Sequence, residues 1–250
     1  MKWKSHIAIA RAISIEMGLP EEMERGLCSG SVEPDRRPDA IYRKQGKTLR
    51  IARAPHHTPH MDTIMAYIWR ARRAYLIGND YWAVKNLGRA LHYVQDKCVS
   101  PGKGFRKHDV REEYVADLTP PMEAVVDGIE IAVCSPDFVQ QCVAEIRPLK
   151  HPEEILFQAT LYSAAISAAV LGPLEPEDKM INKYYRTIRL HKLRPFIGSM
   201  AAVTSITSIF FNYYLISIST AMVAAVAIAN PRYGRVCEEA EWFGLQAHNR

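Results

Sequence analysis

Residues 81–98 read YWAVKNLGRALHYVQDKC, and this stretch decides the fold class. Leu87, Leu91 and Val94 recur at helical spacing, so they form one apolar stripe along a helix. Similar patterns, punctuated by glycine or proline, run through most of the chain and predict about ten helices. We therefore expect an all-α protein in which residues 1–250 form a single multi-helix bundle domain.

The composition is that of an ordinary globular protein, with 48% hydrophobic and 24% charged residues, which excludes disordered and fibrous classes. The net charge of +5 fits a polyanionic ligand, although a normal solvated surface also explains it. The chain has 5 cysteines, an odd number, and no CxxC pair, which indicates a reduced intracellular protein. Polar residues interrupt any apolar run near the N-terminus, so we expect no signal peptide and a cytoplasmic, not secreted, location.

The C-terminal half contains two uncharged runs, residues 155–172 and 195–230. A membrane-spanning helix needs about 20 apolar residues, so the second run is too long for one span and short for two. It is also rich in serine and threonine. We expect both runs to form core helices, and a membrane-embedded hairpin is the alternative.

Two helical pairs combine a histidine with a carboxylate four residues later: His92 with Asp96, and His108 with Glu112. A spacing of four places both side chains on one face of a helix, close enough to share a metal ion. Imidazole and carboxylate are common zinc ligands. An ordinary pair of side chains on an exposed helix surface explains His92 and Asp96 equally well. A run of solvated charged residues without a function explains His108 and Glu112.

Further candidates lie upstream. The segment Gly30-Ser31-Val32-Glu33-Pro34-Asp35 is expected to be a proline-braced turn that presents Asp35 as a metal ligand or general base. Ordinary turn chemistry is the alternative. The remaining candidates are histidines, one on the first helix and three at a helix start: His6, His56, His57 and His60.

These residues form an ordered series that resembles the zinc-dependent phospholipase C family, which also includes the single-strand-specific zinc nucleases. Leu91-His92-Tyr93-Val94-Gln95-Asp96 matches the family's LHYxxD helix, and Pro34-Asp35 matches its upstream loop. The resemblance covers residues 6 to about 112, and the C-terminal half agrees by helical class alone. It implies an all-α fold with three zinc ions at the bottom of a cleft.

The resemblance also implies the metal ligands: His6, Asp35, His56, His57, His60, His92, Asp96, His108 and Glu112. Among the clustered histidines, His57 is the first choice for one position, with His56 and His60 as rivals. The Asp96 carboxylate would bridge two zinc ions, and Asp35 would be a ligand or the catalytic base. We expect one to three zinc ions, with two favoured.

The sequence departs from the family pattern in two places. Family members have a further histidine after a proline that follows the bridging aspartate, whereas Pro101 is followed here by Gly102-Lys103. Mature members also use the free amine of an N-terminal tryptophan. Here Trp3 is internal, so Met1 is the alternative for that role.

The resemblance implies a phosphoesterase that hydrolyses a phosphodiester, either a phospholipid head group or a nucleic acid, with metal-activated water. Asp35 would orient or deprotonate the water. Four cations are candidates for neutralising the phosphate: Arg36, Arg37, Lys103 and Arg106. The alternatives are a non-catalytic helical protein stabilised by metal, and a membrane-associated helical protein with a membrane surface as its partner.

Overall fold

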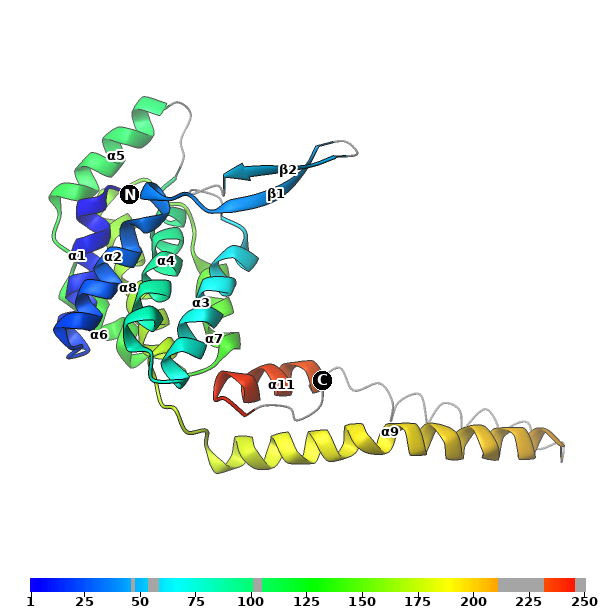
Figure 1. Ribbon diagram of the computed structural model, residues 1–250. Helices are drawn as coiled ribbons and strands as arrows, with labels where there is room; N and C mark the ends of the chain where they lie inside the picture. Colours follow the sequence, from blue (N-terminus) through cyan, green and yellow to red (C-terminus); the bar gives the residue numbers. More distant parts are fainter. Residues whose placement is uncertain (46–47, 54–58, 101–104, 211–231, 246–250) are drawn as a thin grey trace. The chain divides into compact units, whose positions relative to one another are not determined.

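The computed structural model describes residues 1–45, 48–53, 59–100, 105–210 and 232–245. Helices dominate this part of the chain, so the predicted all-α class is confirmed (Figure 1). The elements are α1 (Trp3–Glu16), α2 (Glu21–Arg36), β1 (Ala40–Gln45), β2 (Thr48–Arg53), α3 (Met61–Leu76), α4 (Asp80–Lys97), α5 (Phe105–Asp117), α6 (Met122–Glu130), α7 (Pro136–Glu145), α8 (Pro152–Val170), α9 (Asp178–Phe210) and α11 (Arg232–Trp242).

The chain divides into two compact units, Met1–Pro173 and Leu174–Arg250. The sequence predicts one domain for the whole chain, because no obvious linker interrupts it. The boundary falls just after α8, where Gly172 and Pro173 end the helix. A glycine–proline pair is a strong stop signal for a helix, but it does not by itself separate a helix end from a unit boundary.

Helix α4 lies at the centre of the first unit and packs against α2, α3 and α8. Every residue from Ala90 to Asp96 is buried. Polar side chains are rarely buried without partners, so the LHYVQD stretch must find its hydrogen bonds inside the protein. The partners come from α1, α2 and α8, and they build the site described below.

A close backbone contact joins α2 to α4. A Cβ atom at Gly30 would lie 2.1 Å from the carbonyl oxygen of Lys85, and one at Gly88 would lie 2.4 Å from the carbonyl oxygen of Leu27. No larger residue fits these two positions without moving a helix, because the obstructing atoms belong to the backbone. The contact therefore brings the C-terminal end of α2 directly beside the polar residues of α4.

The first uncharged run forms most of α8, and most of its residues are buried. Arg72 of α3, itself fully buried, satisfies the carbonyl groups at the end of this helix. Its guanidinium donates to the carbonyl oxygens of Val170 (2.9 Å), Gly172 (3.0 Å) and Pro173 (2.6 Å). A helix leaves its last carbonyls without intrahelical partners, and a cation is favourable at this end.

An antiparallel β-hairpin, β1–β2, follows α2 and was not identified from the sequence. Asp39 lies immediately before β1, and its side chain holds the start of the hairpin against α3 and α4. The carboxylate accepts hydrogen bonds from the Tyr93 hydroxyl at 2.5 Å and from Tyr67 and Arg89. Burial, together with the hydrogen bond to Asp39, raises the pKa of Tyr67 to about 12, so this phenol stays protonated as a donor.

The second unit pairs α9 with α11 through a small cluster in which Tyr184 packs against Val236 and Ala240. The second uncharged run was expected in the core, but the side chains described in it, at residues 195–204, 206 and 207, lie largely at the surface. The exposed fractions of Phe196, Met200 and Val203 are 66%, 55% and 63%.

In this described part of the run, the absence of charge therefore does not reflect burial. Its hydroxyl groups bond within the helix: Ser199 donates to the Pro195 carbonyl at 2.8 Å and Thr204 to the Met200 carbonyl at 2.9 Å. Residues 211–230 of the expected core run lie outside the described residues. Within the described ranges, no helix combines the length and the apolar character that crossing a bilayer requires.

Replacing Gly30 by alanine tests the α2–α4 contact. The added Cβ would collide with the backbone of α4, so we expect the free energy of unfolding to fall by about 1–3 kcal/mol. Ser29→Ala, on the exposed side of the same helix, should change it by less than about 0.5 kcal/mol. Urea denaturation of both variants measures the difference, and equal stability of the two would contradict the contact.

Candidate metal centre

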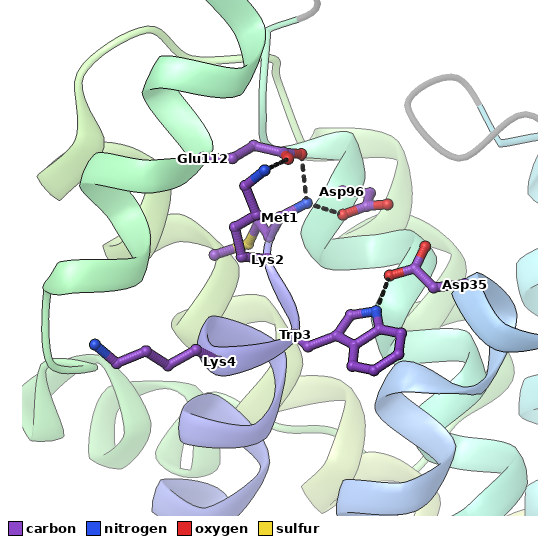
Figure 2. A pocket seen from close by; sticks show the side chains of 7 residues that line it. All are labelled: Met1, Lys2, Trp3, Lys4, Asp35, Asp96 and Glu112. Carbon is purple, nitrogen blue, oxygen red and sulfur yellow. Dashed lines mark hydrogen bonds and ion pairs between the residues drawn. The ribbon is translucent and has the colours of Figure 1, made fainter.

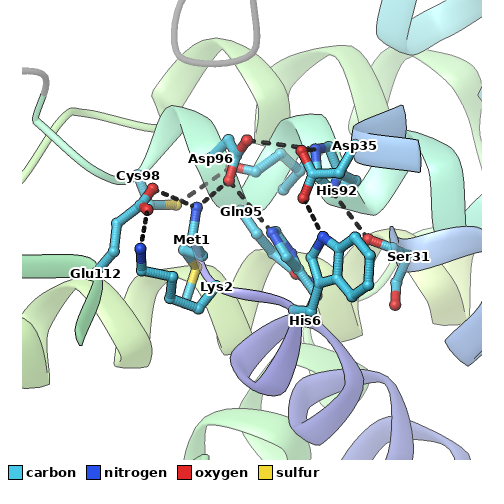
Figure 3. Close-up of polar contacts among 12 residues, drawn as sticks. Met1, Lys2, His6, Ser31, Asp35, His92, Gln95, Asp96, Cys98 and Glu112 are labelled. Carbon is cyan, nitrogen blue, oxygen red and sulfur yellow. Dashed lines mark hydrogen bonds and ion pairs between the residues drawn. The ribbon is translucent and has the colours of Figure 1, made fainter. Parts of the chain in front are cut away.

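Three side chains from three helices meet at one end of the first unit: His6 of α1, Asp35 of α2 and His92 of α4 (Figure 3). Each offers one ligand atom, and these atoms all lie within 4.8 Å of one another. Asp96 adjoins them from the next turn of α4. The structure therefore brings together four of the residues that the resemblance implies as metal ligands.

Asp35 lies in the last turn of α2, not in the proline-braced turn that the sequence predicted. The helix continues through the buried Pro34 to Arg36. The indole nitrogen of Trp3 donates to Oδ2 of Asp35 at 2.6 Å, and Oδ1 lies 3.6 Å from Nε2 of His92. The carboxylate is thus aimed by an aromatic side chain from α1 and by the end of a rigid helix.

His92 is held in one orientation by the backbone of α2. Its Nδ1 lies 2.9 Å from the carbonyl oxygen of Ser31, which is an acceptor, so Nδ1 carries the proton and donates. Nε2 is then the basic nitrogen, and it lies 3.3 Å from Oδ2 of Asp96. Burial lowers the pKa of His92 to about 4, so the imidazole is neutral at pH 7, the form that binds metals.

His6 is oriented in the same way by a different partner. The amide nitrogen of Gln95 donates to the Ser163 hydroxyl at 3.0 Å, which turns its Oε1 toward Nδ1 of His6 at 2.5 Å. Nε2 of His6 is buried and lies 3.3 Å from Oδ1 of Asp96, without a hydrogen-bond partner in the described part of the chain. The rings of His6 and His92 stack with centroids 4.4 Å apart.

Asp96 connects the histidines to a second group of charges. The N-terminal ammonium of Met1 is buried between the carboxylates of Asp96 and Glu112, and it lies 2.9 Å from the latter. Burial alone would raise the pKa of Asp96, but the N-terminal ammonium beside it holds that pKa well below its usual range. Burial would lower the pKa of the amine, but Asp96 and Glu112 raise it, so the pair stays charged.

The carboxylates and the N-terminal segment line an open pocket of about 620 Å³ (Figure 2). The lining residues are Met1, Lys2, Trp3, Lys4, Asp35, Asp96 and Glu112. The pocket therefore combines cations from the start of the chain with carboxylates from α2, α4 and α5. His6 and His92 lie beneath it, fully buried.

The other histidines predicted as ligands are not placed in this group. His60 is exposed at the start of α3. His56 and His57 lie outside the described residues. His108 lies in α5, four residues before Glu112, and its side chain is not among those described.

The structure describes the side chains of only two of the four cations that were predicted to bind phosphate. The guanidinium of Arg36 lies 4.6 Å from the centre of the Trp3 ring, beside Asp35, and Arg37 is exposed. Lys103 falls outside the described residues, as does the side chain of Arg106 in α5. Lys2 and Lys4, which sequence reasoning missed, line the pocket instead.

The sequence analysis also missed the residues that orient the histidines. Gln95 stands inside the quoted LHYVQD stretch, and a polar residue there on a mostly apolar helix was a usable signal. Ser31 contributes a backbone carbonyl, and Ser163 lies in a distant apolar helix. Nothing local in the sequence identifies these two.

No known protein family, curated protein or solved structure matches the chain. The resemblance described from the sequence therefore rests on its quoted residues alone.

The metal-free protein should lose stability as the pH falls from 6.5 toward 4. In this range the unfolded chain binds a proton at His92 and the folded chain does not, so folding becomes less favourable. The shift from 6.5 to about 4 corresponds to a loss of about 3 kcal/mol. Below pH 4, protonation of Asp96, whose pKa is lowered by folding, adds to the loss.

Urea denaturation in the presence of a chelator, at several pH values, measures this dependence. His92→Gln should flatten the curve between pH 4 and 6.5, even if the variant is less stable overall. An unchanged slope in the variant would contradict the assignment of a buried neutral imidazole.

Proposed function

We propose that this protein binds zinc through His6, Asp35, His92 and Asp96 and hydrolyses phosphate esters with metal-activated water. The observation that carries the proposal is the paired orientation of His6 and His92. Each donates from Nδ1 to a fixed oxygen acceptor and turns Nε2 toward the carboxylates. Such outer partners are typical of metal-ligating histidines, because they fix the tautomer and the ring.

The donor set fits zinc. Two imidazole nitrogens and carboxylate oxygens are ligands that zinc accepts in tetrahedral sites, at about 2.0–2.2 Å. Nε2 of His6 is buried and has no hydrogen bond within the described residues, which is costly unless a ligand satisfies it. The two oxygens of Asp96 face different neighbours: Oδ2 lies near His92, and Oδ1 lies near His6 and the N-terminal amine. This carboxylate is therefore the one that two ions would share, if two bind as the resemblance implies.

Zinc, when bound, lowers the pKa of a coordinated water toward neutrality and polarises a phosphoryl oxygen. The protein would supply the remaining requirements. The side chain of Asp35 is 31% exposed and lines the pocket, so its carboxylate is accessible to a proton from the attacking water. Trp3 holds Oδ2 of Asp35 and thereby fixes the direction of that carboxylate.

The pocket suits a phosphate ester in size and charge. Its volume of about 620 Å³ is typical of small-molecule sites. Lys2 and Lys4 lie at its edge with partly or mostly exposed side chains, so both can approach a phosphate. Their charges would offset the carboxylates that otherwise repel an anionic substrate. A phospholipid head group and a nucleic acid both satisfy this description.

A structural zinc site is the second candidate function, and one observation favours it: His6 and His92 are both completely buried. An ion held there would join α1, α2 and α4 and stabilise the fold without turnover. The partial exposure of Asp35 at the pocket favours the catalytic function over this alternative.

Metal analysis combined with a chromogenic phosphodiester assay tests the proposal. The zinc-reconstituted protein should retain zinc after gel filtration and hydrolyse bis(p-nitrophenyl) phosphate. His92→Ala should lose both properties, because it removes a ligand. Asp35→Asn should lower turnover by about 100-fold or more through loss of a base.

His151→Gln is the matched control, because this histidine is exposed at the start of α8. It should retain zinc and turnover. Zinc retention with no turnover on any phosphate ester would favour the structural site. A protein that retains no zinc would contradict both functions.

Gln95→Met should weaken zinc binding by about 10–100-fold, because His6 loses the acceptor that fixes its tautomer. Competition with a chromophoric chelator measures the affinity. Gln141→Met, on the exposed side of α7, serves as the control and should leave the affinity unchanged. Equal affinity of the two variants would show that Gln95 does not position a ligand.

A further inference from the structure

Helix α9 presents a continuous stripe of exposed side chains that plays no part in the metal centre. Its first half carries Lys179, Arg186 and Arg189 on this stripe. All three are exposed, and they form no ion pair with the described residues. At steps of four and three, the same line continues into exposed Leu193 and Phe196.

The apolar part of the stripe extends along the second half of α9. Met200 and Val203 follow Phe196 at steps of four and three, and both are more than half exposed. We call the whole line, from Lys179 to Val203, the α9 stripe. It is cationic at its N-terminal end and apolar at its C-terminal end.

Along the first half of α9, the opposite face of the helix is already occupied. Met180, Tyr184 and Ile188 recur at steps of four and pack against α11. Helix α11 lies beside this half of α9 (Figure 1), and the cations of the α9 stripe lie on the other face of the helix, by its periodicity. Large apolar side chains that stay exposed along one line of a helix mark a surface that another body covers.

The charge of α9 indicates the nature of that body. Asp178 is the only acidic residue of the helix, and it lies at the first position. The positive half of the stripe would repel the same half of a second copy, whereas an anionic surface complements it. A helix with Lys and Arg beside exposed Phe, Leu and Met is the pattern of helices that lie in the interface of an anionic bilayer.

We propose that the α9 stripe binds the surface of an anionic lipid bilayer. The cations of the first half contact lipid head groups, and Leu193, Phe196 and Met200 enter the boundary between head groups and acyl chains. The long Lys and Arg side chains reach the head groups while their methylene stems lie along the apolar boundary. This proposal is independent of the metal centre and of any turnover there.

Co-sedimentation of the full chain with phosphatidylcholine vesicles, with and without phosphatidylserine, tests the proposal. We expect binding to the vesicles that contain phosphatidylserine, and weaker binding at high salt because salt screens the charges. The triple variant K179Q/R186Q/R189Q should bind about 100-fold more weakly, at about fivefold per charge. The double variant F196S/M200S should also lose at least tenfold, because it removes the apolar contact.

The matched control is R25Q/R147Q/K150Q, which removes the same charge from exposed positions of the Met1–Pro173 unit. It should bind like the unchanged chain. Circular dichroism establishes that all variants remain folded, as expected for exposed positions.

Three results would overturn the proposal. The first is equal binding to vesicles with and without phosphatidylserine. The second is a loss of vesicle binding in the control variant as large as that in the triple variant. The third is self-association of the chain through the α9 stripe in place of vesicle binding. The last would appear as a concentration-dependent dimer that F196S/M200S abolishes, with no vesicle binding.

Discussion

The close contact between α2 and α4 is the constraint on which the candidate metal centre depends. With glycine at positions 30 and 88, the two backbones touch. The Ser31 carbonyl consequently reaches the His92 ring, and Asp35 in the next turn reaches the same histidine. A larger residue at the contact would separate the helices and remove an acceptor and a carboxylate together.

The centre also depends on a balance of buried charge. Asp96 is buried beside the neutral imidazole of His92 and keeps its negative charge because the N-terminal ammonium is next to it. A buried carboxylate without a cation would cost several kcal/mol. Positive charge is thus required at this end of the bundle, and the proposed zinc ion would provide more of it. His92 adds no positive charge of its own: burial lowers its pKa more than the two nearby carboxylates raise it, so the imidazole is neutral.

The sequence allowed part of this to be predicted. The periodicity around Leu91 predicted the helical class, and the spacing of four predicted that His92 and Asp96 share a face, because both are local properties of a helix. The prediction that Asp35 lies in a turn was wrong because Gly30 and Pro34 were taken as turn signals, whereas α2 continues through both to Arg36. Ser163 was missed because its partnership with Gln95 exists only after distant helices pack. The run that begins at Pro195 was expected in the core because lack of charge was equated with burial, whereas its described side chains are largely exposed.

The polar chain from His6 through Gln95 to Ser163 has a consequence for the alignment of the helices. Apolar faces slide past one another at little cost, so a core of Leu, Ile and Ala alone tolerates several alignments of similar energy. A shift of α1 by one turn would move His6 by about 5.4 Å and break its bond to Gln95. The buried amide thus selects one longitudinal position for three helices, whether or not an ion ever binds.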